Sequence, residues 1–125
     1  MKPMQEIAVS IDSPSGIPVK VGSGQPLLLI GGPCVLESEE LARNVAETML
    51  EICHRLGISY VFKASFDKAN RTSLSSYRGP GLEKGLATLA KLRDELQVPV
   101  ISDIHDVTQV EAAAEVLDII QIPAF

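Results

Sequence analysis

Positive charge is concentrated in one stretch of a chain that is otherwise acidic. The chain has 125 residues and a net charge of −5, yet residues 63–81 hold four cations and one acid: Lys63, Lys68, Arg71 and Arg78 against Asp67. Lysine offers phosphate or carboxylate a compact charge and arginine a bidentate fork, while the hydroxyls of Ser65, Thr72 and Ser73 add short donors. The alternative is a solvated basic loop. The length of the stretch and its place after a predicted strand favour a site for a small polyanion.

The other unusual polar residues also follow predicted strands. They are Cys34 and Glu37 after the first strand, Asp103 and His105 after the third, and Gln121 after the fourth. In parallel α/β folds the carboxyl ends of the strands converge on the ligand site. We therefore expect these side chains and the basic stretch to face a common centre.

Hydrophobic periodicity predicts the elements that position these residues. Continuous aliphatic runs predict four strands, at 27–30, 58–62, 98–101 and 117–122. Ser38 as N-cap and Gly57 as stop delimit a first helix, with an apolar stripe Leu41, Val45, Met49, Ile52 and Leu56. A second helix carries Leu82, Leu86, Leu89, Leu92 and Leu96, and a third spans 107–116 after a capping box of Asp106 and Gln109.

Alternation of strands and helices predicts a parallel sheet, either doubly wound or closed as a barrel. A dinucleotide-binding fold is disfavoured because Gly31-Gly32-Pro33 is not a G-x-G-x-x-G turn. The barrel is favoured, with residues 1–26 as an N-terminal β-hairpin and residues 27–125 as the N-terminal half of a (β/α)8 barrel. Because four strands cannot close a barrel, we expect a truncated chain.

Composition excludes several functional classes. The net charge of −5 argues against nucleic acid or anionic lipid as a partner, and no apolar run is long enough to span a membrane. The N-terminus lacks the apolar core of a signal peptide, and the two cysteines, Cys34 and Cys53, do not form a disulfide framework. We therefore expect a cytoplasmic protein, with Cys53 as a buried structural residue.

Four segments resemble one enzyme family in order and spacing. KASFDKANRTS with SYRGPG, the opening GGPCVLES, the segment SDIHD and the closing IIQIPAF look like the signatures of 3-deoxy-D-manno-octulosonate 8-phosphate synthases. The resemblance runs from about Leu27 to Phe125. The first motif is specific to that family, whereas the Gly-Pro-Cys element is shared with 3-deoxy-D-arabino-heptulosonate 7-phosphate synthases.

The resemblance implies a transferase that condenses phosphoenolpyruvate with D-arabinose 5-phosphate in lipopolysaccharide biosynthesis, working as a homo-oligomer, expected to be a tetramer. It assigns phosphoenolpyruvate to Lys63, Ser65, Lys68 and Gln121 with the Pro123-Ala124 backbone. It assigns the pentose phosphate to Asn70, Arg71 and Thr72, where Thr72 stands at a place often filled by serine. Lys68 and Asn70 are candidate catalytic residues by the same resemblance.

Cys34 is similar to the cysteine of the metal-dependent branch of that family. The resemblance implies a divalent metal such as Fe, Zn or Mn, whose remaining ligands, a histidine, a glutamate and an aspartate, lie in a second half that this sequence does not contain. A lone cysteine is otherwise more often a small buried apolar residue.

Asp103 and His105 are further catalytic candidates. His105 suits acid/base chemistry near neutral pH, and Asp103 suits a metal contact or a substrate hydroxyl. The alternative is that both residues only cap the third helix and close the strand end through hydrogen bonds.

Two rival functions remain open. One is the sister reaction with erythrose 4-phosphate, which the KANRTS stretch argues against. The other is a non-catalytic half-barrel that associates with itself through open strand edges.

Overall fold

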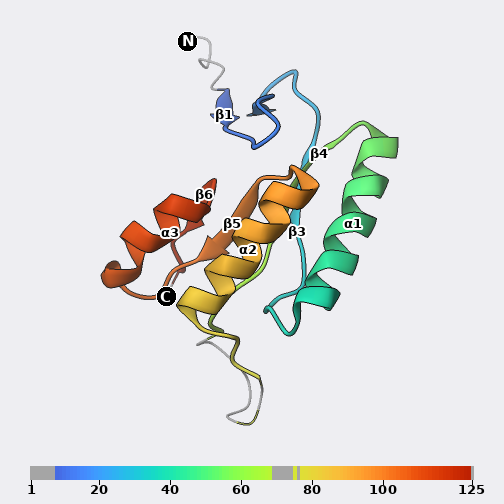
Figure 1. Cartoon of the computed structure of the whole chain (residues 1–125). Helices are drawn as coiled ribbons and strands as arrows, with labels where there is room; N and C mark the ends of the chain where they lie inside the picture. Colours follow the sequence, from blue (N-terminus) through green and yellow to red (C-terminus); the bar gives the residue numbers. More distant parts are fainter. Residues whose placement is uncertain (1–7, 69–74, 76, 125) are drawn as a thin grey trace.

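The computed structural model describes residues 8–68, 75 and 77–124, and it contains two sheets (Figure 1). Strand β1 (Val9–Ile11) pairs antiparallel with β2 (Val19–Val21), which confirms the predicted hairpin. The larger sheet has four parallel strands in the order β3-β4-β5-β6.

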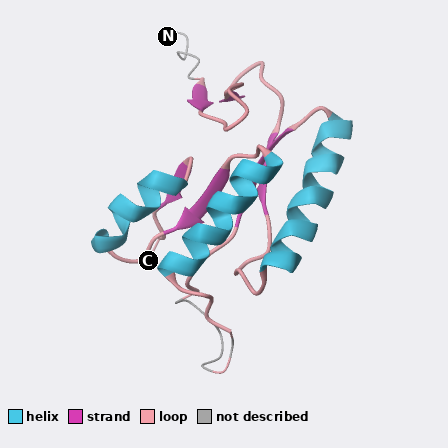
Figure 2. Cartoon of the chain, viewed as in Figure 1, coloured by secondary structure: helices cyan, strands magenta, loops and turns pink. Residues whose placement is uncertain are grey.

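The elements of the parallel sheet alternate as predicted (Figure 2). In chain order they are β3 (Leu28–Gly31), α1 (Glu39–Leu56), β4 (Ser59–Lys63), α2 (Leu82–Leu96), β5 (Val100–Asp103), the 3-10 turn η1 (Val107–Gln109), α3 (Val110–Val116) and β6 (Ile119–Gln121). Four parallel strands and three helices of a (β/α)8 barrel are therefore present. Lys63 and Asp103 are the last residues of their strands, rather than the first residues of the loops that follow.

The hairpin lies at the end of the sheet opposite to the beginning of α2 (Figure 1). A groove separates the hairpin from the amino-terminal ends of β4 and β5, with Ile17 and Lys20 on one wall and Tyr60 and Pro99 on the other. The carboxyl ends of the parallel strands are left clear of it.

The two faces of the parallel sheet have different roles. Tyr60, Phe62 and Val100 face the three helices and belong to the hydrophobic core together with residues such as Leu89 and Leu92 of α2. The alternate residues face the other way, toward the interior of the barrel, because side chains along a strand alternate between faces. This interior face holds the candidate site.

The first helix begins and ends as predicted, but its buried stripe differs. The Ser38 side chain accepts a hydrogen bond from the backbone N–H of Leu41, and Gly57 closes the helix with a positive φ of 66°. The buried residues of α1 are Ala42, Ala46 and Cys53, while Leu41 is 38% exposed. Small side chains let the helix approach β4 closely, and the larger aliphatic residues of the predicted stripe lie beside them.

Strand β3 is not buried on both faces as the sequence suggests. It pairs only with β4, and the exposed fractions are 72% for Leu27 and 42% for Ile30. At the other edge of the sheet, Ile122 after β6 is 72% exposed. Both edges of the sheet therefore present apolar side chains that no described part of the chain covers.

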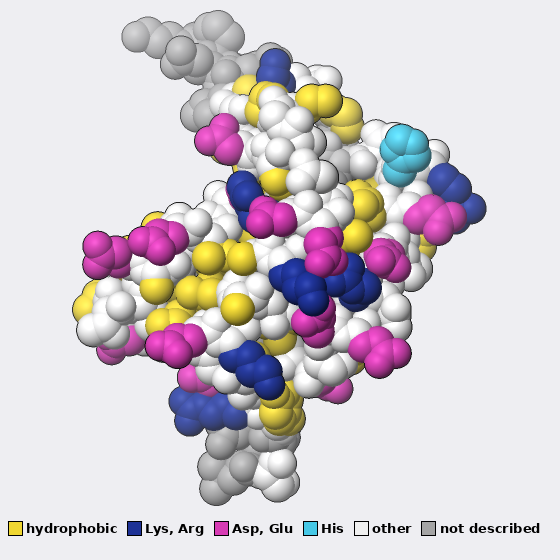
Figure 3. Space-filling model, viewed as in Figure 1, with side chains coloured by type: hydrophobic (Ala, Val, Ile, Leu, Met, Phe, Trp, Pro, Cys, Tyr) yellow, Lys and Arg dark blue, Asp and Glu magenta, His cyan; other side chains and the backbone are white. Residues whose placement is uncertain are grey.

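An ion-pair network joins the outer surfaces of α1 and α2 (Figure 3). Glu39 accepts from Lys91 at 2.5 Å, and Arg43 reaches Glu95 at 2.5 Å. The hydrogen bond from Lys91 lowers the pKa of Glu39 below its usual value. These groups are exposed, so they serve as a solvated helix surface rather than as a site.

None of the helices described here is both long and apolar enough to cross a membrane.

Candidate active site

The register of the parallel sheet brings three of the predicted polar residues to the same face. Lys63 is paired with Ile101, and Asp103 two residues later is paired with Gln121. Because positions two apart on a strand share a face, Lys63, Asp103 and Gln121 all point to the barrel interior at the carboxyl ends of β4, β5 and β6. The expected convergence of strand-end residues is therefore present in the backbone.

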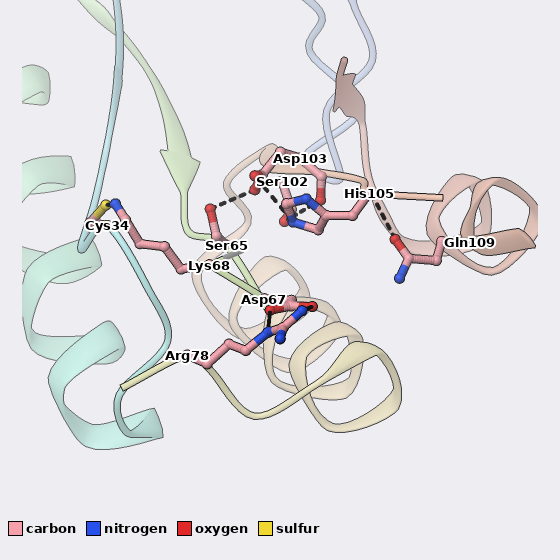
Figure 4. A network of polar contacts seen from close by, with 9 residues as sticks. All are labelled: Cys34, Ser65, Asp67, Lys68, Arg78, Ser102, Asp103, His105 and Gln109. Carbon is pink, nitrogen blue, oxygen red and sulfur yellow. Dashed lines mark hydrogen bonds and ion pairs between the residues drawn. The ribbon is translucent and has the colours of Figure 1, made fainter. Parts of the chain in front are cut away.

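Ser65, Asp103 and His105 lie in one chain of polar contacts (Figure 4). The hydroxyl of Ser65 donates to Oδ1 of Asp103 at 2.5 Å, and Oδ2 of Asp103 lies 3.3 Å from Nε2 of His105. Ser65 is only 5% exposed, and the side chains of Asp103 and His105 are 15% and 20% exposed. Such partly buried charged contacts are stronger than exposed ones because water screens them less.

His105 is held from two further directions. Its backbone N–H donates to the side-chain oxygen of Gln109 at 2.8 Å, and its ring packs edge-on against Phe66, with ring centroids 6.0 Å apart. Nε2 of His105 is buried and forms no hydrogen bond of good geometry with the described residues. The imidazole is therefore fixed in place with one nitrogen facing the carboxylate of Asp103.

The predicted capping box between the side chains of Asp106 and Gln109 does not form, because each side chain bonds to another residue. Asp106 caps the 3-10 turn η1 by accepting hydrogen bonds from the backbone N–H and the hydroxyl of Thr108, and these bonds lower the pKa of Asp106. Gln109 reaches back to His105, one residue before the cap. Neither Asp103 nor His105 caps a helix, so that part of the alternative is wrong. The other part, closure of the strand ends through hydrogen bonds, agrees with the contact between Ser65 and Asp103.

Cys34 lies beside Lys68, although the two are 34 residues apart in sequence. The ammonium group of Lys68 contacts the sulfur of Cys34, which is exposed at the end of β3 (Figure 4). The backbone of the same segment continues the sheet, because Ser65 N–H donates to the carbonyl of Cys34 at 3.3 Å. A thiol and an ammonium group therefore lie next to each other at the carboxyl ends of the strands.

Gly32 explains how β3 approaches β4 so closely. A Cβ at position 32 would lie 1.9 Å from the carbonyl oxygen of Lys63, well inside van der Waals contact. Next to it, the buried Tyr60 hydroxyl donates to the carbonyl of Gly31 at 2.9 Å, and burial raises the pKa of Tyr60. Glycine at position 32 is therefore a requirement for close packing of the two strand ends.

A metal site is incomplete in the described residues. Within residues 8–68, 75 and 77–124, no group of three or more His, Cys, Asp or Glu side chains is placed to hold a metal ion. Cys34 has the ligand type that zinc and iron prefer, and its exposed thiol at the strand ends is accessible to an ion. The described residues therefore supply one suitable ligand for the implied metal, Cys34.

Arg78 does not belong to an open anion-binding cluster as the sequence suggests. Its guanidinium group donates two hydrogen bonds to Asp67, at 2.5 and 3.2 Å, and the hydrogen bonding to this carboxylate raises the pKa of Arg78. One of the four cations is thus neutralised within the chain. Lys63 and Lys68 remain at the strand ends.

Several predicted residues are not tested by this geometry. Asn70, Arg71 and Thr72 lie outside the described residues. Pro123 and Ala124 come after Ile122, just beyond β6. The last residue of β6, Gln121, accepts a hydrogen bond from Ile104 N–H at its backbone carbonyl, at 3.2 Å. Glu37 is exposed just before α1.

Sequence reasoning missed three residues that shape the site. Gln109 holds the backbone of His105, Phe66 packs on its ring, and Asp67 pairs with Arg78. Only Gln109 carried a local signal, since its place three residues after Asp106 marked it as a capping residue. Phe66 and Asp67 act through tertiary contacts that have no fixed spacing.

Comparison with known proteins agrees with this geometry. The family model described as the DAHP synthetase I family matches residues 6–125. The chain is 75% identical over 117 residues to a 2-dehydro-3-deoxyphosphooctonate aldolase of Desulfotalea psychrophila, covering 94% of this chain and 42% of the relative. Relatives of the same name in Syntrophotalea carbinolica and Citrifermentans bemidjiense are 61% and 58% identical, each over 86% of this chain and 39% of the relative.

The chain spans about two fifths of the length of the curated relatives it matches. The family match, in contrast, covers nearly the whole chain and includes all four strand ends described above. The chain belongs to the DAHP synthetase I family.

Proposed function

We propose that the protein containing this chain condenses phosphoenolpyruvate with D-arabinose 5-phosphate, giving 3-deoxy-D-manno-octulosonate 8-phosphate and inorganic phosphate. The observation that carries the proposal is the meeting of Lys63, Lys68, Ser65, Asp103 and Gln121 at the carboxyl ends of β4, β5 and β6 and in the segment after β4. Relatives up to 75% identical are named for this eight-carbon phosphorylated sugar acid.

The chemistry requires control of charge on phosphoenolpyruvate. Its C3 attacks the aldehyde carbon while the aldehyde oxygen takes up a proton, and the positive charge that develops at C2 is relieved when water adds there and loses a proton. Cleavage of the bond between C2 and the phosphate oxygen then releases inorganic phosphate and leaves the keto acid. Lys63 and Lys68 are suited to neutralise the carboxylate and phosphate, with the Gln121 side chain as a further polar contact. Preorganised charges in a water-poor pocket stabilise such states more strongly than water does, and holding two substrates together contributes up to about 7–11 kcal/mol.

His105 and Asp103 are suited to proton transfer near the new bond. The imidazole nitrogen that faces Asp103 is buried and lies 3.3 Å from the carboxylate. In this role Asp103 orients both His105 and the Ser65 hydroxyl. Lys68 and Asn70 remain candidate catalytic residues, and Arg71 and Thr72 remain candidates for the pentose phosphate.

The proposal includes a divalent metal of the Fe, Zn or Mn type. Cys34 would supply one ligand, and the others would come from outside this chain. When bound, such a metal orients or activates the aldehyde or the water that adds at C2. Chelation is expected to abolish turnover, and a Cys34→Ala variant is expected to lose bound metal, measured by elemental analysis.

The proposal also covers the setting of the enzyme. The substrates are small molecules in this proposal, because the relatives are named for a phosphorylated sugar acid. We further propose a homotetramer, which the family resemblance of the signature segments implies, and a location in the cytoplasm. Analytical ultracentrifugation of the full protein tests the tetramer.

Phosphate release from phosphoenolpyruvate by the full protein tests the reaction. Arabinose 5-phosphate is the expected acceptor. The match to a family model described for DAHP synthetases makes erythrose 4-phosphate the second acceptor to assay. Turnover with erythrose 4-phosphate alone would replace the proposed substrate, and no turnover with either aldose would refute the proposed reaction.

A further inference from the structure

Phe66 connects the beginning of α2 to the imidazole of His105. It has no exposed surface and belongs to the hydrophobic core. Its ring meets the ring of His105 edge-on, with the centroids 6.0 Å apart and the planes at 83°. Its backbone carbonyl accepts a hydrogen bond at 3.0 Å from the N–H of Gly81, the residue that precedes α2. One buried residue therefore contacts both a core helix and a candidate catalytic side chain.

Gly85 of α2 is packed directly on Phe66. It is buried, and a Cβ added at position 85 would lie 2.3 Å from the Phe66 Cβ and 3.3 Å from the Phe66 Cα. Glycine is unfavourable inside a helix, because it loses more conformational freedom on folding than alanine does. The close approach of α2 to Phe66 is the physical reason for glycine at this position.

The imidazole of His105 depends on such a contact for its orientation. The hydrogen bond from the His105 N–H to Gln109 fixes the backbone, but it leaves the two side-chain torsions of the histidine free to turn. Aromatic rings in contact prefer edge-to-face or offset arrangements, so the ring of Phe66 restricts these torsions. The orientation that results directs Nε2 of His105 at Oδ2 of Asp103, 3.3 Å away.

We infer that Phe66, packed on Gly85, is a positioning residue for His105. The inference rests on the proposed function, in which His105 transfers a proton near the new bond. Because Phe66 is fully buried, it acts through the imidazole rather than on a substrate. Proton transfer requires the acid or base to lie within hydrogen-bond reach of the reacting atom, so an imidazole that turns away loses much of its effect.

Steady-state kinetics of the full protein with phosphoenolpyruvate and arabinose 5-phosphate tests the inference. Phe66→Leu keeps an apolar side chain but removes the ring, and it is expected to lower kcat about tenfold while both KM values change less than about twofold. Gly85→Ala, which places a methyl group between α2 and Phe66, is expected to lower kcat selectively in the same way. Alanine is the better helix former, so weaker helix propensity does not explain that loss.

Combination with His105→Gln separates positioning from packing. His105→Gln alone is expected to lower kcat about a hundredfold. In that background Phe66→Leu should cause no further loss of kcat, because the imidazole that Phe66 positions is absent. A residue that only packs the core would lower kcat by the same factor in both backgrounds.

Phe62→Leu is the matched control. Phe62 lies on β4, has no exposed surface and belongs to the same hydrophobic core as Phe66. The control is expected to lower the unfolding temperature about as much as Phe66→Leu, while kcat stays within about twofold of the parent value. Thermal unfolding shows which variants are folded at the assay temperature. Phe66→Met, which fills more of the space with a flexible chain, carries the same test if Phe66→Leu does not fold.

Several results would overturn the inference. An equal loss of kcat in Phe62→Leu would make the effect a general loosening of the core, and an equal factor in both backgrounds of the double-variant experiment would make Phe66 a packing residue. His105→Gln with the parent kcat would remove the role of His105 and leave the proposed reaction intact. A parent protein inactive with arabinose 5-phosphate would overturn the proposed function and the inference together, whereas an active parent with an unaffected Phe66→Leu variant would overturn the inference alone.

Discussion

The hydroxyl oxygen of Ser65 lies 2.5 Å from a carboxylate oxygen of Asp103, across the carboxyl ends of two neighbouring parallel strands. A hydrogen bond between a hydroxyl and a charged carboxylate is worth about 1.5–3 kcal/mol in a partly buried position. The contact therefore couples the segment after β4 to the end of β5.

Loss of this hydrogen bond is expected to reduce turnover. Asp103→Asn should lower kcat/KM for phosphate release by about ten- to a hundredfold, because each 1.36 kcal/mol of lost stabilisation is a tenfold change in rate. Ser65→Ala should also lower kcat/KM. Ser102→Ala is the control, since its buried hydroxyl donates to the backbone carbonyl of Asp103 and not to the carboxylate; an equal loss in that variant would contradict the prediction.

The side chain of Gln109 is expected to stabilise the turn that carries His105. Gln109→Leu leaves the His105 N–H without its acceptor, so the free energy of unfolding should fall by about 0.5–1.5 kcal/mol. Urea denaturation measures this change. Gln25→Leu, at an exposed position in the loop before β3, should change stability much less, and a loss of the same size there would argue against a specific role of Gln109.

Acidification is expected to remove the contribution of the Asp106 cap. The Thr108 hydrogen bonds lower the pKa of Asp106 in the folded state, so the unfolded state binds more protons as the pH falls. The cap therefore stabilises the fold above the ordinary aspartate pKa of about 3.9, and this contribution is lost as the pH falls through the lower, folded pKa. Between about pH 6 and about pH 2, the free energy of unfolding measured with urea should fall less steeply in Asp106→Asn than in the parent.

The ion pair of Arg93 and Asp118 is expected to be the most sensitive polar contact of the fold. Arg93 donates two hydrogen bonds to Asp118, at 2.8 and 2.9 Å, and Asp118 also accepts from Val100 N–H while its side chain is 4% exposed. Asp118→Ala should cost about 3 kcal/mol because it removes the acceptor of the Val100 N–H and leaves the partly buried Arg93 guanidinium with the longer 3.6 Å contact to Asp94. Chemical denaturation measures the loss. Glu95→Ala, which removes the exposed partner of Arg43, should cost much less.

The 125-residue chain produced alone is expected to associate. Leu27 and Ile122 are each 72% exposed at opposite edges of the sheet, and open edges with apolar side chains pair readily with another chain. Sedimentation velocity should show an average mass that rises with protein concentration. The Ile122→Lys substitution should make this rise smaller. A monomer at all concentrations would exclude the self-associating half-barrel.

The order of elements could be predicted because its signals are local. The Ser38 cap, the Gly57 stop and the leucines of α2 lie within single helices, and each performs its predicted role. The strands were displaced by one to two residues, as for β5, since strand ends depend on pairing with neighbours rather than on the aliphatic run alone. The stripe of α1 was misplaced because close packing on β4 favours alanine, which periodicity of large side chains does not reveal.

The candidate site was predictable to the level of its elements. Strand-end positions indicated that Ser65, Asp103 and His105 face one centre, because parallel strands bring their carboxyl ends together. The partners of individual side chains were not predictable. Whether Arg78 faces a ligand or Asp67 depends on how the chain returns past Phe66, a tertiary arrangement that the sequence spacing leaves open.

The contact between Gly32 and Lys63 also limits how this arrangement can vary between proteins. A side chain at position 32 would meet the carbonyl oxygen of the last residue of β4, so any substitution must part the two strands. Parting them would carry Cys34, two residues later, away from Lys68. A glycine two positions before the cysteine is thus a sequence marker of this close approach of the strands. In a library with all amino acids at position 32, active clones should retain glycine alone, however many substitutions the neighbouring positions tolerate.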